Sequence, residues 1–282
     1  MSGVQITCDS ACDLPQAVSR RYRIDQLAMG VHLGKKFYQD RAEVSSGDLY
    51  AYSEQTGDLP EISAVTVEDY KTCFLHHLSQ GREVVHISLS SQLSQCYQNA
   101  CIAAESLKGV YVVDSCSIST GAGHLAMLGA ELACADYRAA EIAEALNEMK
   151  QNLDVSFILQ SPAYLHRSGR AGGLTALGAR LLHVRPEIEV QKGAIRTGRP
   201  FRGDMEQTIL QYVKSRLQSC RRVQTDRIFI TYSGVPQAIL DQVVRLLKQL
   251  QPFEQILTIP ASSAVSCRCG PGCLGLAFMT NR

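Results

Sequence analysis

Three serine hydroxyls stand close together in one short stretch of the chain, where they could bind an anionic head group. Ser90, Ser91 and Ser94 follow an apolar run over residues 83–89 that predicts a buried strand. In open parallel sheets, ligands bind at the carboxyl ends of strands, near helix N-termini whose free N–H groups attract negative charge. One hydroxyl is enough to cap a helix, so three of them favour contact with a ligand.

Acidic and hydroxyl residues also follow two other predicted strands. Asp9 and Ser10 come after a strand expected over residues 4–8, and Asp114 and Ser115 end a similar apolar run. Single Asp and Ser side chains at such positions commonly cap the next helix. We interpret these four residues as helix caps.

Arginines are the second kind of candidate binding group, because the planar guanidinium suits a carboxylate or a phosphate. Arg167 and Arg170 lie in a glycine-rich stretch, and Arg202 follows further along the chain. Arg268 stands in an expected turn over residues 266–272 that contains Gly-Pro-Gly. The alternatives are a solvated basic face for the first group and an ordinary loop with one exposed arginine for Arg268.

Several enzyme signatures are missing from the sequence. It contains no phosphate-binding P-loop, no Gly-x-Ser-x-Gly elbow and no His-Glu-x-x-His zinc motif. Residues 121–126 match a relaxed dinucleotide pattern but begin well after the preceding strand, so we interpret their glycines as helix packing or a turn. The 11 cysteines lack paired knuckles and do not favour a metal site, and no cofactor is expected. His86, His124 and His166 are expected to be ordinary buried or surface residues.

Strands alternate with helices along the chain, which is typical of an α/β fold with a mainly parallel sheet and crossover helices. We expect extended segments over residues 4–8, 23–33, 83–89, 109–113, 155–159, 186–190, 196–203, 227–232, 253–259 and 274–279, with a tight turn over 193–195. Helices are expected over 46–55, 122–135, 139–152, 174–182, 206–219 and 236–249, with others opening at Asp13 and ending at Ala104. Gly and Arg become frequent after residue 161. This change predicts an N-terminal α/β domain over residues 1–160 and a second α/β domain over residues 161–282.

Charge and hydropathy exclude several functional classes. The formal net charge is +1, which gives no indication of nucleic-acid binding. No apolar run approaches the roughly 20 residues of a membrane span, so no stable membrane insertion is expected. The N-terminal residues lack the basic and apolar regions of a signal peptide, and a cytoplasmic location is expected.

Taken in order, these segments resemble the DegV family. Residues 9–15, Asp-Ser-Ala-Cys-Asp-Leu-Pro, are similar to its Asp-Ser-x-x-Asp-Leu-Pro motif, and residues 87–100 are similar to its serine turn. Residues 164–170 resemble its Tyr-Leu-x-Arg-Gly-Gly-Arg block, the Arg202-Gly203 pair resembles one near its second hairpin, and residues 270–278 resemble its closing block. The shared order and spacing over nearly the whole chain makes the resemblance specific.

The resemblance implies a carrier of one long-chain fatty acid, held in a tunnel in the cleft between two α/β domains. It implies no catalysis by the chain itself, and presentation of the carboxylate to a separate ATP-dependent fatty acid kinase that forms an acyl phosphate. The head-group residues that it implies are Ser63, Ser90, Ser91, Ser94 and Arg268, and the residues on the kinase or phosphate side are Arg167, Arg170 and Arg202. Ile62 replaces a family threonine and Arg268 a family histidine, so the head-group site is altered rather than lost.

Two other hypotheses stay open. The first is a hydrolase or transferase that acts on an acyl or phospho compound in the same cleft, which requires a nucleophile with a base in reach. The sequence alone shows no such pair. The second is a regulatory protein whose altered pocket binds a different small anion, or nothing.

Overall fold

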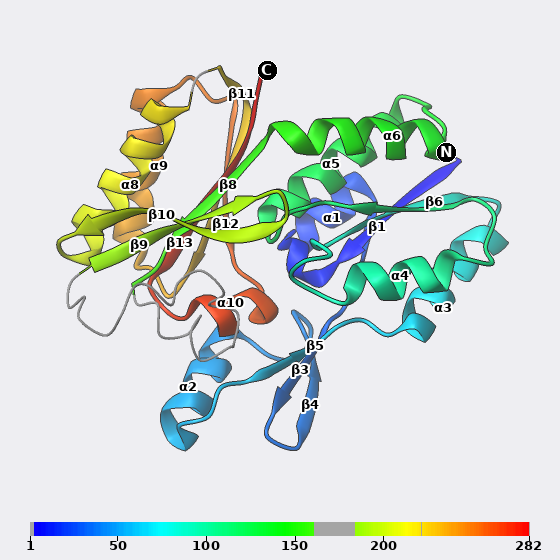
Figure 1. Cartoon of the computed structure of the whole chain (residues 1–282), viewed down its shortest axis with the longest axis horizontal. Coiled ribbons are helices and arrows are strands. Elements are labelled where there is room, and N and C mark those ends of the chain that lie inside the picture. The colour runs from blue at the N-terminus through cyan, green and yellow to red at the C-terminus, as the bar shows by residue number, and fades with distance from the viewer. Residues whose placement is uncertain (1–2, 161–183, 221, 282) are drawn as a thin grey trace. The chain divides into compact units, whose positions relative to one another are not determined.

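The computed structural model describes residues 3–160, 184–220 and 222–281 and has an α/β fold (Figure 1), as the sequence predicts. The chain divides into two compact units. The first unit comprises Met1–Val44, Glu61–Gln151 and Lys192–Ala194, and the second comprises Ser45–Pro60, Asn152–Gln191 and Ile195–Arg282. The domain boundary predicted after residue 160 stays a prediction.

The first unit is built on a parallel sheet with strand order β2-β1-β6-β7. Its strands are β1 (Val4–Asp9), β2 (Ile24–Leu27), β6 (Glu83–Ser88) and β7 (Val110–Asp114). Its helices are η1 (Ser10–Cys12), α1 (Gln16–Tyr22), α3 (Val67–Ser79), α4 (Cys96–Ala104), α5 (Thr120–Cys134), α6 (Ala139–Met149) and η2 (Lys150–Asn152), the last of which runs into the second unit. In Figure 1, α5 and α6 lie on one face of the sheet and α3 and α4 on the other. Helices on both faces explain why Val84, Val85 and Ile87 are fully buried.

Helix α5 packs closely on the segment that follows β1. A side chain at Gly123 would collide with the backbone carbonyl of Cys12 and with Leu14. The interpretation of this glycine as helix packing is therefore confirmed.

A small antiparallel sheet completes the first unit. It consists of β4 (Lys36–Gln39), β3 (Gly30–Leu33) and β5 (Glu61–Ser63), with β3 in the centre. The extended segment predicted over residues 23–33 is confirmed as β2 and β3. Strands β4 and β5 were not predicted because each is short and has no clear alternation of buried and exposed residues.

The second unit contains a six-stranded mixed sheet of order β10-β9-β8-β13-β11-β12. Its strands are β8 (Leu153–Ile158), β9 (Val184–Gln191), β10 (Ala194–Arg202), β11 (Val223–Ser233), β12 (Gln255–Pro260) and β13 (Cys273–Thr280), and its helices are α2 (Ser46–Thr56), α8 (Met205–Ser219), α9 (Gln237–Leu250) and α10 (Ser263–Cys269). Strands β11 and β12 are parallel, whereas β8 and β11 flank β13 in antiparallel pairs. The helix predicted over residues 174–182 lies outside the described residues.

Helices α8 and α9 bury one apolar face each against this sheet. Tyr212 and Val213 of α8 and Val243 and Leu247 of α9 are fully buried in a cluster with strand residues such as Ile230. The apolar positions recur at helical spacing, which is why the sequence predicts both helices closely. No helix in the described part of the chain is long and apolar enough to span a membrane.

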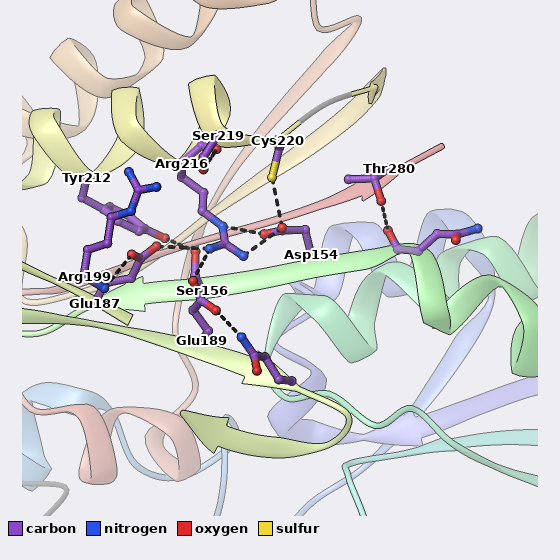
Figure 2. A network of polar contacts seen from close by, with 12 residues as sticks. Asp154, Ser156, Glu187, Glu189, Arg199, Tyr212, Arg216, Ser219, Cys220 and Thr280 are labelled. Carbon is purple, nitrogen blue, oxygen red and sulfur yellow. Dashed lines mark hydrogen bonds and ion pairs between the residues drawn. The ribbon is translucent and has the colours of Figure 1, made fainter. Parts of the chain in front are cut away.

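A polar network lies among β8, β9 and α8 (Figure 2). Arg216 of α8 donates two hydrogen bonds to Asp154, each at 2.8 Å, and one to Glu189 at 2.6 Å. Glu187 lies 3.4 Å from the same guanidinium, and Tyr212 shares a hydrogen bond of 2.8 Å with Ser156. The Arg216 side chain is only 14% exposed, so these charges are largely removed from water and depend on one another.

Candidate functional site

The serine turn, here residues 89–94, follows β6 in the first unit. The hydroxyl of its first serine, Ser90, is hydrogen-bonded to other residues of the chain. The hydroxyl of Ser90 is buried, donates to the carbonyl of Gly193 at 2.7 Å and accepts from the backbone N–H of Gln92 at 3.2 Å. The Gln92 amide donates to the carbonyl of Lys192 at 2.7 Å. Ser90 and Gln92 thus fix the turn against residues 192–194, and a ligand contact by Ser90 stays a prediction.

The other two serines are more accessible. Ser91 is exposed, and its backbone N–H donates to Asp114 at 3.2 Å. Ser94 is half-buried, and its oxygen accepts from the N–H of Cys96 at 3.2 Å at the start of α4. A hydroxyl that accepts can still donate. The structure therefore brings the three serines together, with the hydroxyls of Ser91 and Ser94 better placed than that of Ser90 to donate to an anion.

The close approach of Gly193 to Ser90 leads to a first prediction. Gly193 has φ +84°, and an added Cβ would lie 2.6 Å from the Ser90 oxygen. Gly193→Ala should cost about 1 kcal/mol for the left-handed backbone and roughly 2 kcal/mol more for the collision. Urea unfolding followed by circular dichroism measures the loss.

The matched control is Gly81→Ala in the same unit. Gly81 has φ +72° but open space around the added atom, so its replacement should carry only the backbone cost. Equal losses for the two variants would contradict the packing of residues 192–194 on the serine turn.

Asp9 binds the backbone N–H of Leu89 at the start of the serine turn and is not the helix cap that the sequence suggests. It precedes η1 but makes no side-chain capping bond. Its fully buried carboxylate accepts from the hydroxyl of Tyr70, from that of Ser88 at 3.0 Å and from the N–H of Leu89 at 2.9 Å, and it lies 3.4 Å from His86. Burial alone raises the pKa of Asp9, but the charge and hydrogen bonds of these partners hold it below its ordinary value.

The other three residues interpreted as helix caps also have different partners. The Ser10 hydroxyl donates to buried Asp40 at 2.7 Å. Asp114 accepts from the N–H groups of Ser91 and Cys116, and the Ser115 hydroxyl accepts from the N–H of Ser117 at 3.1 Å. Asp114 and Ser115 thus close the turn that follows β7, whereas Ser10 binds a distant part of the first unit from the first position of η1.

Ser63 lies in β5 of the small sheet, where it meets a residue that the sequence did not single out. Its hydroxyl shares a hydrogen bond of 3.1 Å with Nε2 of His32 on the neighbouring strand β3. Gly30 leaves the room for this serine, because a side chain there would collide with the Ser63 hydroxyl. His32 is therefore a candidate head-group residue, and only the pairing of β3 with β5 reveals it.

The arginine candidates that the structure describes lie in the second unit. Arg268 is half-buried in the last turn of α10, so the turn expected there is wrong: it begins only at Gly270, where the helix ends. Arg202 is exposed at the end of β10. Arg167 and Arg170 lie outside the described residues.

The remaining histidine and cysteine predictions concern buried groups. His86 and His124 are fully buried, as expected, although Asp9 gives His86 a carboxylate neighbour from a distant part of the sequence. Cys267, Cys269 and Cys273 are buried free thiols. Within residues 3–160, 184–220 and 222–281, no cluster of three or more His, Cys, Asp or Glu side chains is arranged to hold a metal ion.

Comparison with known proteins covers nearly the entire chain. Residues 3–281 match the model of the DegV family, which is described as a family of uncharacterised proteins. A DegV domain-containing protein of Clostridium acetobutylicum is 24% identical, with 99% of both chains covered. A fatty acid-binding protein of Thermotoga maritima is also 24% identical, with 98% of this chain and 97% of the other covered.

Solved structures share the fold over the same extent. A structure described as fatty acid binding of a DegV family protein from Thermus thermophilus has a TM-score of 0.88 and 23% identity, and 99% of both chains is covered. The family match extends over both units and over every predicted head-group residue. The chain is therefore a member of the DegV family.

Proposed function

We propose that this protein binds one long-chain fatty acid and acts as its carrier without catalysing a reaction. The observation that carries the proposal is the family match over residues 3–281. Two full-length relatives, from Thermotoga maritima and Thermus thermophilus, are described as binding fatty acids. Burial of an acyl chain contributes about 0.8 kcal/mol per methylene, which offsets the cost of ordering the ligand.

The carboxylate of the ligand would be held by hydroxyls and one permanent cation. Ser63, with His32 beside it, and Ser91 and Ser94 of the serine turn supply hydrogen-bond donors. Arg268 adds a guanidinium, which keeps a carboxylate ionised and can bind it through two parallel hydrogen bonds. Ser90 holds the turn in place, and it would bind the carboxylate directly by turning its hydroxyl proton from the carbonyl of Gly193 to the ligand.

Arg268→Met tests the head-group assignment. Loss of a charge-assisted hydrogen bond should weaken palmitate binding at least tenfold, because such a bond is worth about 1.5–3 kcal/mol. Arg245→Met, at an exposed position of α9 in the same unit, serves as the control and should bind as the wild type does. Isothermal titration with palmitate measures both, and equal affinity for Arg268→Met and wild type would remove Arg268 from the site.

We further propose that the protein presents the bound acid to a separate ATP-dependent kinase. Arg202, exposed on β10, and Arg167 and Arg170 would contact that partner or the new phosphate. Arginine suits both tasks because its fork matches carboxylates and phosphates. A pull-down from the native organism with palmitate-loaded protein, repeated with Arg202→Met, tests this part separately from ligand binding.

An enzymatic alternative gains one specific observation, the contact between Ser63 and His32. A serine within 3.1 Å of an imidazole nitrogen has the geometry of a nucleophile with its base. Within the described residues, however, no carboxylate pairs with His32 to orient it. The carrier proposal therefore predicts no hydrolysis of an acyl p-nitrophenyl ester above background, and turnover that Ser63→Ala abolishes would favour the enzyme.

A further inference from the structure

A chain of three hydroxyl groups connects α2 to α10 within the second unit. The Tyr50 hydroxyl lies 2.5 Å from the Ser233 oxygen at the end of β11. The Ser233 hydroxyl donates to Ser266 of α10 at 2.9 Å, and the Ser266 hydroxyl lies 3.4 Å from the carbonyl of Ala261. Ser233 and Ser266 are buried, so each needs these partners.

The direction of these hydrogen bonds follows from the single proton that each hydroxyl carries. Ser233 uses its single proton toward Ser266, so it can only accept from Tyr50. Burial raises the pKa of the Tyr50 hydroxyl, which keeps its proton at any physiological pH. Tyr50 is therefore the fixed donor at the head of the chain.

The same strand end also holds the turn that follows α10. The N–H of Gly272 donates to the carbonyl of Ser233 at 2.8 Å. Gly234 has φ +62°, and its missing side chain leaves room for Pro271, whose ring carbon would lie 2.9 Å from an added Cβ. Ser233 thus anchors α10 through Ser266 and the following turn through its own backbone. Arg268 lies between these two anchor points.

We propose that Tyr50 is a positioning residue that sets the place of α10, and with it the guanidinium of Arg268, for recognition of an anionic head group. This inference rests on the proposed function, because it takes Arg268 as a head-group residue. Loss of the Tyr50 hydroxyl would leave Ser233 free to rotate its proton away from Ser266. Helix α10 has only seven residues, so its position depends on such tertiary contacts more than on its own hydrogen bonds.

The test compares two ligands with the same chain and different heads, palmitate and hexadecanol. Tyr50→Phe should weaken palmitate binding about fivefold, the effect of one ordinary hydrogen bond, and leave hexadecanol binding unchanged. Tyr52→Phe, two residues away on the same helix, is the matched control and should change neither. An equal loss for both ligands, or no loss for palmitate, would overturn the proposal, since a positioning role acts only through the carboxylate.

A second measurement separates this inference from the proposed function. The Nε–H resonance of Arg268 in a nitrogen-15 spectrum, assigned by its absence from Arg268→Lys, reports the surroundings of the guanidinium without any ligand. It should shift in Tyr50→Phe and stay in place in Tyr52→Phe. Failure of wild type to bind palmitate would reject the carrier function, whereas an unmoved Arg268 resonance in Tyr50→Phe would reject the positioning role whatever the ligand.

Discussion

Replacing Asp9 with asparagine is expected to lower the free energy of unfolding of the first unit by about 3 kcal/mol at neutral pH. Tyr70, Ser88 and Leu89 all donate hydrogen bonds to this buried carboxylate. An asparagine can keep its one oxygen toward Ser88 and Leu89 only by turning its NH₂ group toward Tyr70 and His86, so the hydrogen bond that Tyr70 donates is lost. The substitution also removes the negative charge that strengthens the remaining bonds, so the hold on Leu89 at the start of the serine turn should weaken.

The effect of Asp9 should fade in acid. Its folded-state pKa lies below the ordinary value of 3.8, so the unfolded chain binds more protons near that pH. The stabilisation is therefore complete above the unfolded pKa and is lost as the pH falls through the folded pKa. Urea unfolding of wild type and Asp9→Asn should show a difference that is largest at neutral pH and shrinks below about pH 4.

Asp25→Asn provides the control for Asp9 in the same sheet. Asp25 also pairs with a histidine, His77, at 3.0 Å, but its side chain is 57% exposed. Exposed pairs contribute at most about 1 kcal/mol, so this variant should remain close to wild type. If Asp9→Asn were no more harmful than Asp25→Asn, the buried network could not be what holds the turn.

Replacing Arg216 with methionine should destabilise the second unit by about 3–5 kcal/mol, the usual cost of breaking a buried ion pair from one side. Three carboxylates surround this guanidinium, on Asp154, Glu187 and Glu189 (Figure 2). Burial opposes the charge of Arg216, but Asp154 and the other partners raise its pKa above the ordinary value. Without the arginine, the carboxylates would repel one another in a poorly hydrated place.

The pH dependence identifies the cause of that loss. Burial already raises the pKa of Glu187 in the wild type, and removal of the neighbouring cation should raise it further. A carboxyl whose folded pKa is raised binds more protons when folded, so part of the stability should return as the pH falls toward about 4.5. If Arg216→Met lost the same free energy of unfolding at neutral pH and near pH 4.5, the cause would be packing rather than charge.

Arg199→Met is the control for Arg216, because it removes an exposed guanidinium beside the same network. The side chain of Arg199 bonds Ser215 at 2.9 Å, while its contact to Glu187 is made by the backbone N–H and survives the substitution. A change below about 1 kcal/mol is expected by denaturant unfolding.

Most of the fold could be predicted from the sequence, because strands and helices with a clear apolar face show a recognisable spacing of apolar residues within a short stretch. The alternation of buried runs such as β6 with amphipathic helices such as α9 was sufficient for the α/β class. The assignment of α2 to the second unit could not be predicted, because it depends on contacts with α10, far along the sequence. Helix α10 itself was missed because Gly-Pro-Gly at its end predicts a turn and hides a helix of seven residues.

The candidate site was predictable only in part, for the same reason. Sequence motifs pointed to Ser63 and to the serine turn, but the partners of these residues come from distant strands. His32 reaches Ser63 through strand pairing, and Gly193 reaches Ser90 across more than a hundred residues. Asp9 resembled a cap because an aspartate at a strand end often is one. The carboxylate is buried instead, since Tyr70 and Ser88 satisfy it.

Native mass spectrometry of the purified full-length chain, followed by extraction and identification of bound molecules, tests the carrier function most directly. A carrier should show a mass excess of one fatty acid per chain, or should take up one equivalent of added palmitate if it is purified without a ligand. A correctly folded protein that carries no acyl chain and takes up none would contradict the carrier function, and would mean that Ile62 and Arg268 have adapted the site to another ligand.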